Sequence, residues 1–150
     1  MLNAVIAGYS RSPFTISFKG DLKSIRPEDL LSQVIKDLIS NANLNKDDIE
    51  DVIVGCAFPE GPQGMLMAKS ISILAGLPIS TSGKVVNRFC GSSMDAAHQV
   101  SQAIISGDIK SGIASGVEDM FTVPMGGFVP DFNEKLDEKE FYIGMGETAE

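Results

Sequence analysis

Short apolar segments alternate with helical segments along this chain, and this alternation restricts the fold more than any other feature of the sequence. The apolar segments have the length and composition of buried strands and lie at residues 4–9, 51–56, 84–86 and 112–117. Helices are predicted between them, at residues 27–39, 65–75 and 90–106. Such strict alternation predicts an α/β fold, in which right-handed crossovers build a layered sheet.

The helix expected at residues 27–39 illustrates the pattern. Pro27 suits the first helical position, and Glu28 and Asp29 follow in the first turn, where the helix dipole favours acidic side chains. Apolar residues then recur at helical spacing, at Leu30, Leu31, Val34, Ile35, Leu38 and Ile39. This spacing predicts one apolar face that packs on the sheet.

The character of the chain changes after Met120. Pro124, Gly126, Gly127 and Pro130 break regular structure, and residues 131–140 are charged with mixed sign. We therefore expect an α/β domain over residues 1–120, and over residues 121–150 a solvated, mobile segment.

Composition excludes several classes of function. The 150 residues are 43% hydrophobic, enough for one core, and the net charge of −8 argues against nucleic-acid binding. No apolar run approaches the ~20 residues that span a bilayer. The N-terminus has no basic start of the kind that signal peptides carry.

Metal ligands are too few for a site. The chain has one histidine, His98, and two cysteines, Cys56 and Cys90, without the spacing of metal ligands. We expect no metal and no resident cofactor. So few cysteines also predict a reducing compartment, the cytoplasm.

Cys90 is the candidate nucleophile. It follows the apolar segment 84–86 and begins the helix predicted at residues 90–106, where unpaired N–H groups and the helix dipole would stabilise a thiolate. Gly91, Ser92 and Ser93 add little bulk, so a substrate could approach the backbone. The alternative is a small buried hydrophobe, the usual role of a free cysteine and the one expected for Cys56. The residues alone leave both interpretations of Cys90 open.

No partner base for Cys90 is evident. His98 lies eight residues further along the predicted helix, a rise of ~12 Å, so it cannot pair with the thiol and is predicted to be structural. Ser92 and Ser93 likewise have no identifiable base, which disfavours a serine mechanism. The role of Arg88 stays open.

Five segments resemble the thiolases, a family of acyl-CoA acyltransferases, and in particular the degradative 3-ketoacyl-CoA thiolases. Residues 87–94 (NRFCGSSM) resemble the nucleophile motif of the family, and residues 11–14 (RSPF) its early Arg-Thr-Pro-Phe signature. The others are residues 61–65 with the turn at 75–78, residues 116–120 (GVEDM) and residues 145–150 (MGETAE). The resemblance runs through the whole chain in order.

The resemblance implies a ping-pong reaction in which Cys90 becomes acylated, with its backbone N–H as half of an oxyanion hole. CoA and acyl-CoA would be the substrates, in fatty acid metabolism and β-oxidation. It further implies half of a three-layer thiolase fold, with a mixed sheet, helices on both faces, and the last strand of that half missing. Residues 121–150 would begin the loop domain, and the strand at residues 84–86 would join a homodimer or tetramer.

The sequence also departs from the family. It contains no Gly-His-Pro base, no Cys-x-Gly-Gly-Gly motif and no Asn-Glu-Ala-Phe segment. We therefore expect the N-terminal part of a thiolase, inactive as residues 1–150 alone. The alternatives are a ketoacyl synthase relative and a non-catalytic module that binds acyl chains or a partner. Acyl chain length and reaction direction stay open.

Overall fold

The apolar segments in the middle of the chain form a parallel sheet. The computed structural model describes residues 3–150 and contains three strands, β1 (Asp51–Gly55), β2 (Ser82–Val86) and β3 (Gly112–Gly116). Their order is β2-β1-β3, and Asp51 of β1 is in register with Ser82 on one side and Gly112 on the other. The central strand is buried beyond its first residue, and residues 52–54 have no exposed surface.

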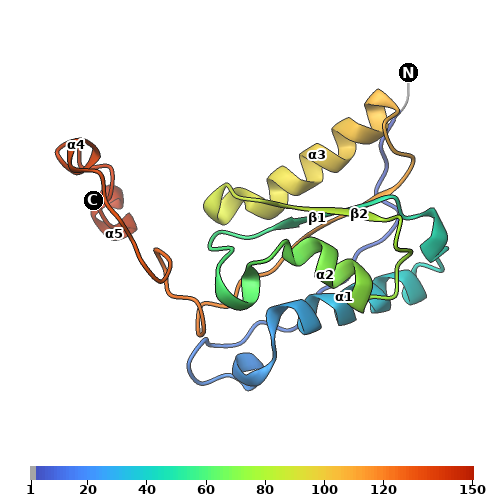
Figure 1. Ribbon diagram of the computed structural model, residues 1–150, viewed down its shortest axis with the longest axis horizontal. Helices are drawn as coiled ribbons and strands as arrows, with labels where there is room; N and C mark the ends of the chain where they lie inside the picture. Colours follow the sequence, from blue (N-terminus) through green and yellow to red (C-terminus); the bar gives the residue numbers. More distant parts are fainter. Residues whose placement is uncertain (1–2) are drawn as a thin grey trace.

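Helices cover both faces of this sheet (Figure 1). On one face, α2 (Met67–Leu74) packs on β1 and β2, and α1 (Pro27–Asn41) packs against α2; on the other, α3 (Ser92–Ser106) packs on β1 and β3. Because side chains alternate along a strand, Val52 and Val54 join the core under α1 and α2, whereas Ile53 joins Ala96 and Val100 of α3. The predicted α/β class with helices on both faces is confirmed.

The pairing is wholly parallel in this part of the sheet, whereas a mixed sheet was expected. Within residues 3–150, strand β2 lies at one edge of this sheet. The predicted helices are also present, although α2 covers a shorter range than residues 65–75.

The strand predicted at residues 4–9 is wrong. This segment is irregular in the structure, and Val5 and Ile6 are 81% and 91% exposed. A groove of about 240 Å³ lies between Gly8–Ser12 and β3, and residues of α1 also line it. Within residues 3–150, β3 pairs only with β1. Since a strand exists only through hydrogen bonds to a neighbouring strand, the apolar composition of residues 4–9 is not enough to form one.

The chain leaves the sheet after β3 and runs to a C-terminal segment set apart from the layers (Figure 1). This segment carries two short helices, α4 (Glu134–Asp137) and α5 (Met145–Ala149), neither with a buried residue. The boundary near residue 120 and the mobility of residues 121–150 stay predictions.

Candidate active site

Cys90 lies in a tight turn between β2 and α3. A 3-10 helix covers Phe89–Gly91, and α3 begins only at Ser92. The prediction that the long helix starts at Cys90 is therefore wrong by two residues. The thiol is exposed, as an acylated nucleophile requires, so the buried alternative is excluded for Cys90.

The backbone of this turn is strained next to the nucleophile. Phe89 has φ of +45°, in the left-handed region that non-glycine residues rarely adopt. Such a conformation costs on the order of 1–3 kcal/mol and persists only where the surroundings enforce it. Side chains from both sides of the turn supply that constraint.

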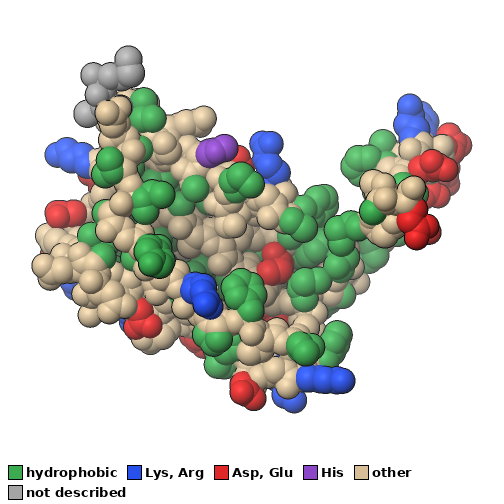
Figure 2. Space-filling view, turned by 180° about the vertical axis from the view of Figure 1, so that it is seen from behind, with side chains coloured by type: hydrophobic (Ala, Val, Ile, Leu, Met, Phe, Trp, Pro, Cys, Tyr) green, Lys and Arg blue, Asp and Glu red, His purple; other side chains and the backbone are tan. Residues whose placement is uncertain are grey.

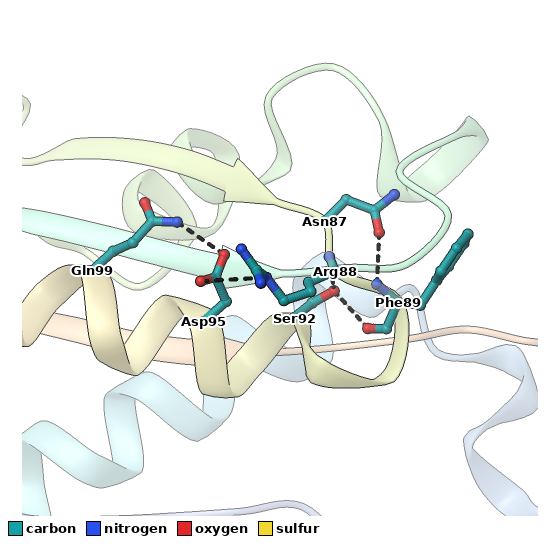
Figure 3. A network of polar contacts seen from close by, with 6 residues as sticks. All are labelled: Asn87, Arg88, Phe89, Ser92, Asp95 and Gln99. Carbon is teal, nitrogen blue, oxygen red and sulfur yellow. Dashed lines mark hydrogen bonds and ion pairs between the residues drawn. The ribbon is translucent and has the colours of Figure 1, made fainter.

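Two side chains bind the backbone of Phe89 (Figure 3). Its N–H donates to Asn87 Oδ1 at 2.9 Å, and its carbonyl accepts from Ser92 Oγ at 2.6 Å. Ser92 Oγ also accepts from the N–H of Arg88 at 2.8 Å. The Ser92 hydroxyl thus donates one hydrogen bond and accepts another in holding the turn.

Glycines at the ends of two strands let α3 begin directly on the sheet. A Cβ on Gly55 would lie 2.4 Å from the backbone of Ser92 and Ser93, and one on Gly116 would lie 2.7 Å from the Ser93 side chain. The turn with Cys90 therefore lies at the carboxyl end of the parallel sheet, where α/β proteins bind their ligands.

Arg88 faces the first turn of α3. Its Nε lies 3.6 Å from Asp95 Oδ1, and Gln99 Nε2 donates to Asp95 Oδ2 at 3.1 Å (Figure 3). The Arg88 side chain is 74% exposed, so the pair contributes little to stability. The structure thus places Arg88 on the surface of the turn.

Glu118 and Gln63 were not predicted, yet they hold the loops beside the turn. The Glu118 carboxylate accepts from the N–H of Ala57 at 2.7 Å, from that of Phe58 at 3.2 Å and from Gln63 Nε2 at 3.0 Å. Gln63 is completely buried and its Oε1 accepts from the N–H of Asp119. The signals in the sequence were the position of Glu118 two residues beyond a strand and the presence of both residues in segments that resemble the thiolases, residues 61–65 and 116–120.

Cys56 differs from Cys90 in its surroundings. It follows β1, is 1% exposed, and its Sγ lies 3.6 Å from Glu118 Oε1. Burial, together with the nearby Glu118 charge, raises the pKa of the Cys56 thiol to about 12. The prediction of a core thiol is confirmed.

The site offers one exposed thiol, that of Cys90, and the one histidine of the sequence lies away from it. His98 is exposed on α3, two turns beyond the nucleophile, as its spacing predicted. Residues 3–150 bring no three His, Cys, Asp or Glu side chains together as a metal site. None of the helices in this range has the length and hydropathy to cross a bilayer.

Comparison with known proteins finds relatives that match along the whole chain. A family model described as "Thiolase, N-terminal domain" matches residues 4–141. The chain is 40% identical to a 3-ketoacyl-CoA thiolase of Bacillus subtilis and 42% identical to one of Colwellia psychrerythraea. Each match covers 100% of this chain and 39% of the relative, so the chain spans about two fifths of the length of the relatives it matches.

Proposed function

The chain belongs to the thiolase family, and on that basis we propose that it is the N-terminal part of an acyl-CoA C-acyltransferase that works through Cys90. The enzyme would cleave 3-ketoacyl-CoA with CoA, or condense two acetyl-CoA in the reverse direction. The observation that carries the proposal is the exposed Cys90 thiol in a strained turn at the carboxyl end of the sheet.

The proposed reaction has two halves. The Cys90 thiolate attacks the 3-keto carbon, the C2–C3 bond breaks, and the departing carbanion takes a proton to become acetyl-CoA. The acyl group stays on Cys90 as a thioester, and the thiolate of a second CoA then attacks it and releases a shortened acyl-CoA. The backbone N–H of Cys90 would be one donor to the oxyanion.

Among residues 3–150, neither His98 nor Cys56 is placed to supply the acid–base groups that these steps need. His98 is exposed two turns along α3, and the Cys56 thiol is buried beside a carboxylate. General acid–base help is worth roughly 10²–10⁴-fold per group. We therefore expect slow, stoichiometric acylation of Cys90 without turnover.

We propose that the protein assembles with copies of itself through β2, which lies at the edge of the sheet. Hydrophobic side chains also gather where the chain leaves the sheet for its C-terminal segment (Figure 2). The exposed ones along this stretch are Met120, Phe121, Met125, Phe128, Val129 and Phe132. Exposed apolar surface of this extent favours association.

CoA and acyl-CoA are the only small molecules that the reaction uses, and the cytoplasm is the proposed location.

A non-catalytic role is the second candidate. His98, the one histidine of the sequence, is exposed two turns along α3 from Cys90, and this position favours a module that binds acyl chains or a partner without turning them over.

Mass spectrometry of the chain incubated with acetoacetyl-CoA separates the two. The catalytic proposal expects one acetyl group on Cys90, absent from a Cys90→Ala variant and retained in a Cys56→Ala variant. An unmodified Cys90 after prolonged incubation would favour the non-catalytic module.

A further inference from the structure

The amide of Asn87 makes two hydrogen bonds in opposite directions. Its Oδ1 accepts from the N–H of Phe89 at 2.9 Å, and its Nδ2 donates to the carbonyl of Ala57 at 2.8 Å. Exchanging the amide oxygen and nitrogen would set donor against donor and acceptor against acceptor, so only one orientation fits. Asn87 therefore ties the strained residue next to Cys90 to the loop after β1.

That loop is itself held from the other side. The N–H of Ala57, whose carbonyl receives Asn87, donates to Glu118 Oε2 at 2.7 Å. Glu118 follows β3, which pairs with β1. Hydrogen bonds thus run without interruption from the end of β3 through Glu118, Ala57 and Asn87 to Phe89, the residue before the nucleophile.

Aromatic packing follows the same path. The rings of Phe58 and Phe89 lie with their centres 5.8 Å apart, and the N–H of Phe58 also donates to Glu118. The loop after β1 therefore contacts the strained residue through both its backbone and a side chain. By contrast, Ser92 constrains Phe89 only from within the turn.

We propose that Asn87 is a positioning residue for Cys90, and that it acts by coupling the nucleophile turn to the loop held by Glu118. The proposal rests on Cys90 as the reactive group. Holding Phe89 in its left-handed conformation keeps the exposed Cys90 thiol in the turn directly before α3. Without the bond to Ala57, the turn can relax away from this position.

The test is the pH profile of Cys90 alkylation by iodoacetamide in the 150-residue chain. The variants are Asn87→Ala, which loses both bonds, and Asn87→Ser, whose hydroxyl can still accept from the Phe89 N–H but is too short for Ala57. Asn87 is uncharged, so both variants keep the charged groups around the turn: Arg88, Asp95 and Glu118. Asn45→Ala is the matched control, because Asn45 caps a turn through a single acceptor bond to Asp47 N–H.

Both Asn87 variants are expected to raise the pH of half-maximal alkylation by roughly 0.2–0.7 unit, the size of a helix-dipole effect. Asn45→Ala is expected to leave it unchanged. In a Glu118→Gln background, Asn87→Ser should have a smaller additional effect, because the two residues act along one path.

Several outcomes would overturn the proposal. An unchanged profile in Asn87→Ala removes the positioning role, and a wild-type profile in Asn87→Ser reduces it to a local cap without the link to Ala57. Cys56 serves as an internal reporter of unfolding because it is buried. If Cys56 is alkylated as fast as Cys90 in both Asn87 variants, the role of Asn87 is structural only.

The same samples separate this proposal from the proposed function. Alkylation needs no acyl-CoA, so shifted profiles in a protein whose wild-type Cys90 is never acetylated would support positioning and contradict the acyltransferase.

Discussion

The ends of β1 and β2 make an informative comparison, because each of these paired strands is followed by a cysteine with a different environment. Cys56 comes directly after β1 and is enclosed by the core and by Glu118. Cys90 comes four residues after β2, in a turn that carries it to the surface. The difference teaches that three extra residues after the strand, together with one strained backbone angle, are enough to place the Cys90 thiol at the surface. The Cys56 thiol, without them, lies in the core.

The largest expected difference between the two ends is in thiol reactivity. Because burial beside Glu118 raises the pKa of Cys56 to about 12, very little thiolate forms there near neutral pH. We expect iodoacetamide at pH 7.5 to modify Cys90 at least ~100-fold faster than Cys56, measured by peptide mapping. In concentrated urea the two rates should converge. Preferential labelling of Cys56 in the folded chain would reverse the assignment.

A substitution at Gly55, at the end of β1, tests how closely this strand packs against the start of α3. A methyl group there would meet the backbone at the start of α3 at 2.4 Å. Gly55→Ala is therefore expected to lower the free energy of unfolding by roughly 1–3 kcal/mol, measured by urea denaturation.

Gly91→Ala, in the Cys90 turn, is the matched control. Its Cβ would meet nothing closer than 3.8 Å. We expect a change within about 0.5 kcal/mol, and equal losses in the two variants would contradict the packing described.

A substitution at Glu118 tests how much its hydrogen bonds to the loop after β1 contribute to stability. Glu118→Gln retains the size of the side chain but loses the charge and one acceptor for the N–H groups of Ala57 and Phe58. Since hydrogen bonds to charged groups are worth about 1.5–3 kcal/mol when buried and less when exposed, we expect a loss of about 1–2 kcal/mol.

The control for Glu118 is Glu60→Gln, whose carboxylate accepts from the backbone N–H of Phe128. That bond lies outside the sheet and the nucleophile turn, so a smaller loss is expected. A larger loss for Glu60→Gln would shift the main constraint to the loop at residues 124–129.

A further effect is expected on stability at alkaline pH. The folded-state pKa of Cys56 lies above its unfolded value of 9.0, so the unfolded chain loses its thiol proton first as pH rises. The contribution of this group is complete below about pH 9 and is lost as the pH rises toward 12. The urea midpoint of wild type should fall between pH 8 and pH 10.5 more than that of Cys56→Ala. Parallel curves for the two proteins would show that Cys56 ionises equally in both states.

Much of the layered fold could be predicted from local patterns. The buried face of α1, which includes Leu31 and Ile35, could be predicted because helical spacing repeats within a few residues. Strand β1 could be predicted because Val52, Ile53 and Val54 form a short apolar run of the kind that buried strands contain. The position of Cys90 after a strand and before a helix followed from the same patterns.

Other features depend on partners far away along the chain. Residues 4–9 have the composition of a strand but no neighbouring strand to which they hydrogen-bond. The strand predicted from their composition is therefore absent. The methionines likewise differ in burial according to the tertiary packing around each of them. Met67 is buried, but Met65, Met94 and Met145 are largely exposed.

The amino-acid sequence by itself determined the α/β order, the small residues around Cys90 and the family to which the chain belongs. These features rest on periodicity and on residues adjacent in the chain. Only the tertiary structure decided that Cys90 precedes α3 rather than starting it, and that Glu118, Ala57 and Asn87 support its turn. The physical reason is distance along the chain: Glu118 and Ala57 are 61 residues apart, and hydrogen bonds over such a separation form only after β1 and β3 have paired.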